Sequence, residues 1–133
     1  MTDVVTSILT KDGKILLLKR GQRVSTYRGK WAGVSGYLEE NETPLERAIR
    51  EIEEETGLSR EEVKLLKQGE IMEFVDENTG RTWRIHPFLF KSDREEIKID
   101  WEHEEYRWIE REKLKEYDTV PKLEDVIDSL MQL

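Results

Sequence analysis

Short runs of apolar and β-branched residues recur along most of the chain and predict strands. The runs at residues 4–9 and 14–19 lie on either side of Asp12-Gly13, a dipeptide typical of tight hairpins, so they are predicted to pair. A polar loop is predicted at residues 21–30. Further strands are predicted at residues 31–34, 63–75, 81–91, 97–101 and 106–109, with a turn at residues 78–80.

A helical pattern occupies residues 44–56. Thr43 is a good N-cap, Pro44 suits the first helical position, and Glu46 completes a capping box. Gly57 is a natural residue for ending the helix. Four apolar residues at positions i, i+3, i+4 and i+7 predict its buried stripe: Leu45, Ala48, Ile49 and Ile52.

A second helical pattern lies within residues 114–133. Strands interrupted by one helix and closed by another predict an α/β fold with a mixed β-sheet between helices. A chain of 133 residues without an internal repeat or linker is expected to form a single domain over residues 1–133. The apolar side of the second helix is predicted to contain Leu123, Val126, Ile127, Leu130 and Met131.

Charge and composition argue against several classes of function. Thirty acidic residues against 22 basic ones give a net charge of −8, so no nucleic-acid partner is expected. A polyanionic small molecule would have to be bound by a local basic patch and a metal ion. The chain has no cysteine, and therefore no disulfide and no thiolate chemistry.

The chain shows no sign of a membrane partner. No apolar run approaches the roughly 18 residues of a membrane span, and the N-terminus lacks the layout of a signal peptide. We therefore expect a cytoplasmic protein, either a monomer or a homodimer.

The helix predicted at residues 44–56 gathers carboxylates beside its apolar stripe. Glu51, Glu54 and Glu55 are related by i+3 and i+4, so they are neighbours and repel one another. Mg²⁺, which binds a few carboxylates together with substrate phosphates, would relieve this repulsion. Arg50 adds a cation that is expected to pair with Glu42. For the acidic run alone, a solvated helix face is the usual interpretation.

The spacing of the whole segment 36–58 decides between these interpretations. It is G-x5-E-x7-R-E-U-x-E-E-x-G-U, where U is a bulky aliphatic residue. This spacing resembles the signature of the Nudix hydrolases, with every fixed position present. The resemblance implies a Nudix-type α/β/α sandwich and Mg²⁺-dependent hydrolysis of a nucleoside diphosphate linked to a group X, with Mn²⁺ as a substitute. The fixed positions are Gly36, Glu42, Arg50, Glu51, Ile52, Glu54, Glu55, Gly57 and Leu58.

The resemblance also implies roles for individual residues. The metal ligands implied within the segment are Glu51, Glu54, Glu55 and Gly36, where the backbone approaches closely. The catalytic residues implied there are Arg50, Glu51 and Glu54, and the structural ones are Gly36, Glu42 and Gly57. The candidates for binding the diphosphate are Arg20, Arg28 and Lys30.

A second acidic group lies just before the strand predicted at residues 106–109. Its Glu-His-x-x-Tyr-x-Trp run is similar to one in the diadenosine tetraphosphate hydrolases. By that resemblance Glu102 is the first candidate for a further metal ligand or the general base, and Glu105 is the second. His103 is another candidate base, although a lone loop histidine is more often exposed.

Leu123 and three longer segments bear on the choice of substrate. Nudix enzymes that act on oxidised guanine nucleotides have a base-reading Asn in a comparable turn. Aligned by the preceding proline, this chain has Leu123 there, so no preference for oxidised guanine nucleotides is expected. The segments 74–88, 99–108 and 118–123 most resemble Nudix domains related to initiation-factor-2B-like proteins, a group for which the resemblance assigns no substrate.

Two functions remain open from the sequence. The first is hydrolysis of a diphosphate linkage in an NTP, ADP-ribose or a dinucleoside polyphosphate. The second is a catalytically silent Nudix-fold module that binds a nucleotide or another protein. The intact acidic segment favours the enzyme, because a silent module has no need for Glu54 and Glu55.

Overall fold

The structure is a computed structural model that describes residues 1–131. Within them, eight strands form one mixed sheet. Its two central strands, β1 (Thr2–Lys11) and β7 (Arg81–Ser92), pair in parallel over most of their length. The other edge of β1 is shared by β4 (Val34–Tyr37) near its start and β2 (Lys14–Arg20) near its end. The outer strands are β3 (Trp31–Ala32) and β8 (His103–Glu110) beside β2, and β5 (Val63–Gln68) and β6 (Met72–Asp76) beside β7.

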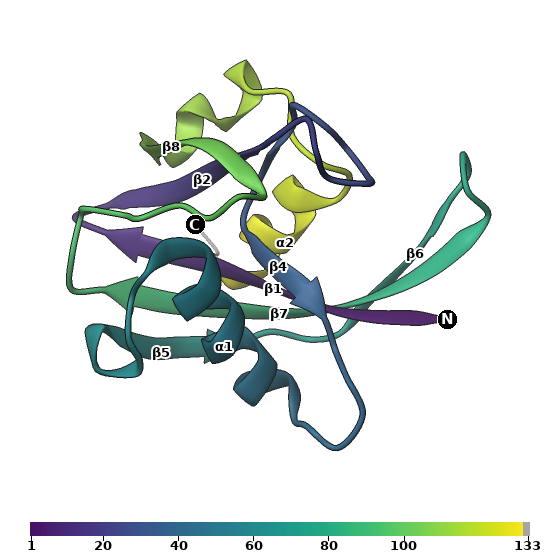
Figure 1. Cartoon of the computed structure of the whole chain (residues 1–133), viewed down its shortest axis with the longest axis horizontal. Coiled ribbons are helices and arrows are strands. Elements are labelled where there is room, and N and C mark those ends of the chain that lie inside the picture. Colours follow the sequence, from purple (N-terminus) through teal and green to yellow (C-terminus); the bar gives the residue numbers. More distant parts are fainter. Residues whose placement is uncertain (132–133) are drawn as a thin grey trace.

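Two helices cover opposite faces of this sheet (Figure 1). Helix α1 (Pro44–Thr56) packs on one face and helix α2 (Leu123–Leu130) on the other, which confirms the predicted α/β sandwich. Both predicted apolar stripes face the core, except that Met131, Leu45 and Ile49 are only partly buried. Short 3₁₀ turns lie at Arg60–Glu62 and Arg111–Glu116, and the last two residues of the predicted helical segment lie outside the described residues. No helix within residues 1–131 is long and apolar enough to cross a membrane.

Helix α1 begins and ends where the sequence predicts, although the predicted capping box forms only in part. The Thr43 hydroxyl accepts a hydrogen bond from the Glu46 backbone N–H at 3.1 Å and donates to the Glu46 carboxylate at 3.0 Å. Gly57 is left-handed, with a φ of 75°, and its N–H bonds to the Glu53 carbonyl at 3.0 Å. The caps fix the ends of α1, and they therefore fix which of its carboxylates lie beside the sheet.

The strand predicted at residues 63–75 is instead two strands, β5 and β6, separated at residues 69–71. The break lies opposite Pro87 of β7, whose nitrogen has no hydrogen to donate to the ladder. The Gly69 N–H bonds to the Pro87 carbonyl at 2.9 Å, which keeps the chain beside β7 through the break.

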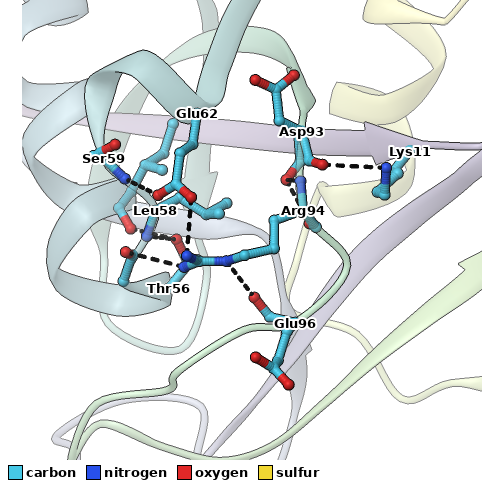
Figure 2. Close-up of polar contacts among 11 residues, drawn as sticks. Lys11, Thr56, Leu58, Ser59, Glu62, Asp93, Arg94 and Glu96 are labelled. Atoms are coloured by element: carbon cyan, nitrogen blue, oxygen red, sulfur yellow. Dashed lines mark hydrogen bonds and ion pairs between the residues drawn. The ribbon is translucent and has the colours of Figure 1, made fainter.

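The strand predicted at residues 97–101 is wrong, because this segment is held by the end of α1 instead of by a sheet. Lys98 donates its backbone N–H to the Thr56 carbonyl at 2.9 Å. Figure 2 shows the Arg94 guanidinium beside the end of α1, donating to the Glu62 carboxylate at 2.9 Å and to the Glu96 carbonyl at 3.0 Å. These contacts anchor the loop 93–102, which carries further acidic residues to the site.

Candidate functional site

The site is built where α1 packs against β4. Glu51 and Glu55 point from α1 into this contact, and only 7% and 2% of their surfaces are exposed. A Cβ atom on Gly36 would lie 2.3 Å from the Glu51 carboxyl carbon. Gly36 is therefore required because the Glu51 carboxylate occupies the space of a side chain. The close approach predicted at this glycine is thus made by a carboxylate of the chain itself.

Burial raises the pKa values of these two carboxyl groups. Burial is the main reason why the pKa of Glu51 is raised to about 7, and the neighbouring charge of Glu54 adds to the effect. Burial also raises the pKa of Glu55 well above its usual range, followed by repulsion from Glu51. Glu102 and Asp100 raise both pKa values further, which shows that the loop 93–102 brings two more carboxylates to the helix.

Arg47, not Arg50, pairs with Glu42. Its guanidinium donates to the two Glu42 carboxylate oxygens at 2.6 and 2.9 Å and is nearly buried. It also lies 3.1 Å from a Glu39 oxygen and 3.7 Å from a Glu51 oxygen. Arg50 is exposed, so the predicted Arg50–Glu42 pair is wrong: one helical turn places residue 47 on the side that faces the loop. A catalytic role for Arg50 stays a prediction.

His103 is buried, contrary to the expectation of an exposed loop histidine. Its Nδ1 lies 2.9 Å from an Asp100 oxygen and its Nε2 lies 3.7 Å from a Glu55 oxygen. Glu105 is turned elsewhere and accepts a hydrogen bond from Arg107 at 2.7 Å. Of the two predicted candidates, the structure thus brings Glu102 to the carboxylates of α1 and leaves Glu105 in a separate ion pair.

A pocket of about 310 Å³ opens beside these carboxylates. Its wall at the acidic end includes Glu51, Glu102 and two cations, Arg20 and Arg47. This end places carboxylates that suit a metal ion near Arg20, a cation that suits phosphate, whereas Arg47 is paired with Glu42, Glu39 and Glu51. The volume falls at the lower end of small-molecule pockets, which span roughly 300–1,000 Å³.

The other end of the pocket is aromatic and apolar. The rings of Tyr37 and Trp83 are stacked with centroids 6.1 Å apart, and the Arg81 guanidinium lies 5.0 Å from the Trp83 ring centre. A flat heterocycle is well suited to such a wall. The remaining apolar lining comes from Val4, Ala32, Phe74, Ile85, Val120 and Pro121.

The other predicted residues are divided between the pocket and the scaffold. Arg20 lines the pocket, whereas Lys30 pairs with Asp118 at 2.8 Å and Arg28 donates to the Val24 carbonyl at 2.7 Å, so neither of these two reaches the pocket wall. Leu123 is buried in the core, and Val120 and Pro121 occupy the pocket in its place.

The donors suit a hard divalent cation, although they are not yet gathered around one point. Within residues 1–131, no three acidic or histidine side chains are arranged as a metal site. The pKa values of Glu51 and Glu55 are raised chiefly by burial, so a cation bound beside these groups would favour their charged forms. Carboxylate oxygens are the ligands that Mg²⁺ prefers, so the residues fit the ion that the resemblance implies.

Four functional candidates are missed by the sequence analysis. Arg47 occupies a variable position of the motif, and its signal is the spacing of four residues to Glu51. Asp100 could have been identified as an acidic residue close in sequence to the predicted Glu102. Tyr37 and Trp83 lie 46 positions apart, and nothing in a single sequence shows that they stack.

Comparison with known proteins agrees with this geometry. The chain matches the NUDIX domain over residues 1–130, and it therefore belongs to the NUDIX family. It is 32% identical to an RNA pyrophosphohydrolase of Cereibacter sphaeroides, covering 74% of this chain and 70% of that protein. It is 30% identical to the nucleoside triphosphatase NudI of Escherichia coli, covering 86% of each.

A solved structure shows the same fold. A NUDIX hydrolase from Nitrosomonas europaea superposes with a TM-score of 0.80 over 97% of this chain and 87% of that one, at 21% identity. The predictions of a Nudix fold and of a pyrophosphohydrolase are thus confirmed. The narrower resemblance to domains related to initiation-factor-2B-like proteins finds no support in these matches.

Proposed function

We propose that this protein hydrolyses the diphosphate linkage of a nucleoside diphosphate linked to X, with Mg²⁺ as its cofactor and Mn²⁺ as a substitute. The observation that carries the proposal is the burial of Glu51 and Glu55 where α1 meets β4, with the charges of Glu102 and Asp100 acting on both. The adjoining pocket, with Arg20 among the residues at one end and an aromatic wall at the other, supports a nucleotide as the substrate.

Glu51, Glu54 and Glu55 would hold the metal, with Glu102 as a further ligand or as the base. When bound, Mg²⁺ supplies Lewis-acid stabilisation of the charge that develops on the phosphate oxygens. Arg20 lines the same end of the pocket and would bind the phosphates that remain on the nucleotide. Tyr37 and Trp83 would hold the base.

Glu102 is the preferred general base. It lines the pocket, and its backbone carbonyl accepts the Gly21 N–H at 2.8 Å, which holds its loop against the end of β2. A carboxylate in this place can accept the proton of the attacking water while Arg47 fixes the neighbouring Glu51. A silent binding module has no need for such a group.

The test is a panel of nucleotides incubated with the protein and Mg²⁺, with phosphate-containing products separated and measured. The panel contains NTPs, ADP-ribose and dinucleoside polyphosphates. We expect hydrolysis of at least one of them, lost on chelation of the metal. Binding without hydrolysis across the whole panel would instead support the silent module.

A further inference from the structure

A hydrogen bond ties together two walls of the pocket that come from distant parts of the chain. The loop 21–30, after β2, contributes Thr26 and Tyr27 to one wall. The β6–β7 hairpin, which extends away from the body of the sheet in Figure 1, contributes Phe74 and Trp83 to another. The Tyr27 hydroxyl donates to the Asp76 carboxylate at 2.5 Å and so joins the loop to the hairpin.

The hairpin side of this contact is well fixed. One Asp76 oxygen accepts the Tyr27 hydroxyl, while the other accepts the Asn78 backbone N–H at 3.0 Å. The Asp76 carbonyl also accepts the Gly80 N–H at 2.7 Å, which closes the turn. Because the turn holds Asp76, the hydroxyl meets a carboxylate that is already oriented.

The loop side is held in an unfavourable conformation. Tyr27 has a φ of 51°, in the left-handed region that aromatic residues rarely adopt. Arg20 fixes the residue before it by donating to the Thr26 carbonyl at 2.9 Å and to the Thr26 hydroxyl at 3.2 Å. Such strain persists only where the surroundings impose it, and it gathers at functional sites.

We propose that Tyr27 and Asp76 form a latch that closes the pocket into a ring and selects free nucleotides over the 5′ ends of polynucleotides. The proposal rests on the proposed function, because it assigns the size of the substrate at the same site. A mononucleotide can be enclosed by the ring, whereas a polymer that continues from its 3′ oxygen would have to pass through it.

Two further observations favour a small nucleotide. The pocket has a volume of about 310 Å³, at the lower end of ligand pockets. The chain also has a net charge of −8, so a polynucleotide outside the pocket would meet repulsion instead of the cationic surface that phosphate backbones need. Relatives of this chain include both an RNA pyrophosphohydrolase and a nucleoside triphosphatase, and the latch favours the second kind of substrate.

The test compares two ligands that the protein cannot hydrolyse at a diphosphate: adenosine 5′-monophosphate and a 5′-phosphorylated adenylate hexamer. Their dissociation constants are measured by tryptophan fluorescence, and the pair is repeated with uridine. Two variants open the latch: Tyr27→Phe removes the hydroxyl, and Asp76→Asn removes the charge but keeps an oxygen for the turn. Tyr106→Phe is the matched control, since it removes a hydroxyl from a tyrosine outside the pocket.

We expect the wild-type protein and Tyr106→Phe to bind the mononucleotide at least about tenfold more tightly than the hexamer. Tyr27→Phe and Asp76→Asn should bring the two constants close together, chiefly by improving hexamer binding. Equal binding of both ligands by the wild type, or a ratio unchanged by both variants, would overturn the proposal.

Limited trypsin digestion tests the latch without any nucleotide. Cleavage after Arg23 and Arg28 reports opening of the loop, and it should be about tenfold faster in Tyr27→Phe than in Tyr106→Phe. An unchanged rate would show that the hydrogen bond does not hold the loop, and would also overturn the proposal. If neither ligand binds the wild type while the loop is latched, the nucleotide assignment has failed, and selection by size fails with it.

Discussion

Arg47 binds Glu42 through two hydrogen bonds of 2.6 and 2.9 Å, and this pair ties the loop before α1 to the acidic side of the helix. The pair lowers the pKa of Glu42, chiefly through the hydrogen bonds, so the carboxylate stays charged. The same guanidinium lies 3.7 Å from Glu51. One arginine therefore positions both the loop and a candidate metal ligand.

Arg47→Lys should reduce kcat/KM strongly although it keeps the charge. Lysine cannot bind both Glu42 oxygens in the geometry of a guanidinium, so the loop and Glu51 would shift. A shift of about 1 Å at a catalytic site costs on the order of 10²-fold in rate. Arg60→Lys is the matched control, since Arg60 is exposed, lies outside the pocket and should tolerate the change. Equal losses in the two variants, or normal activity in Arg47→Lys, would contradict the assignment.

The metal-free protein should lose stability as the pH rises from about 5 to 7.5. The raised pKa values of Glu51 and Glu55 mean that the folded state binds more protons than the unfolded state in this range, so the free energy of unfolding falls with pH. Glu51 accounts for at most about 3 kcal/mol of this fall in the free energy of unfolding, and for less where water screens its charge. The lowered pKa values of Glu42 and Asp76 act in the opposite direction, but below this range.

Thermal unfolding in the presence of a chelator checks this dependence. Glu55→Gln should flatten it and raise the Tm at pH 7.5, because a neutral amide replaces a buried charge. Glu53→Gln is the control, since Glu53 is exposed on the same helix. A Tm that rises with pH between 5 and 7.5 would contradict the raised pKa values of Glu51 and Glu55 in the folded protein.

Glu102→Gln should lower kcat by about 10²- to 10⁴-fold, the usual contribution of a general base, with a smaller change in KM. Glu105→Gln should leave both constants near those of the wild type, because Glu105 is paired with Arg107 outside the pocket. Steady-state kinetics of the two variants decide the matter. A crippled Glu105→Gln beside a normal Glu102→Gln would transfer the role to Glu105, and two normal variants would place the base in α1.

Oxidised dGTP should be no better a substrate than dGTP. The residues that stand near the expected base-reading position are Val120 and Pro121, which line the pocket and offer no side-chain hydrogen bond to a purine edge. The measurement is the ratio of kcat/KM for the two nucleotides. A strong preference for the oxidised form would require a polar group that reads the base.

Much of the fold follows from local signals in the sequence. Thr43, Pro44 and Gly57 set the limits of α1, and the Asp12-Gly13 turn places β1 beside β2, because capping and turn formation involve neighbours in the chain. Pro87 accounts for the break between β5 and β6 once the pairing with β7 is known. That pairing is tertiary, so the sequence alone suggested one long strand.

In the candidate site too, local features can be predicted from the sequence and tertiary contacts cannot. The spacing of the Nudix motif places Glu51 and Glu55 on one helix face, and the structure buries both against β4, whereas Glu54 is exposed. The spacing could not predict that Arg47 pairs with Glu42 or that His103 is buried against Asp100, because these contacts depend on how the loops pack. The strand predicted at residues 97–101 is wrong for the same reason, since Arg94 and Lys98 attach this segment to the end of α1.

The most direct test of the central claim is the metal-dependent hydrolysis of the preferred nucleotide by Glu55→Gln, with Mn²⁺ affinity measured in parallel by calorimetry. If Glu55 belongs to the metal site, the variant should keep its fold, bind Mn²⁺ more weakly by about 10- to 100-fold, and lose most of its activity even at saturating metal. Glu53→Gln should match the wild type in both measurements. Wild-type Mn²⁺ affinity together with normal turnover in Glu55→Gln would contradict the account.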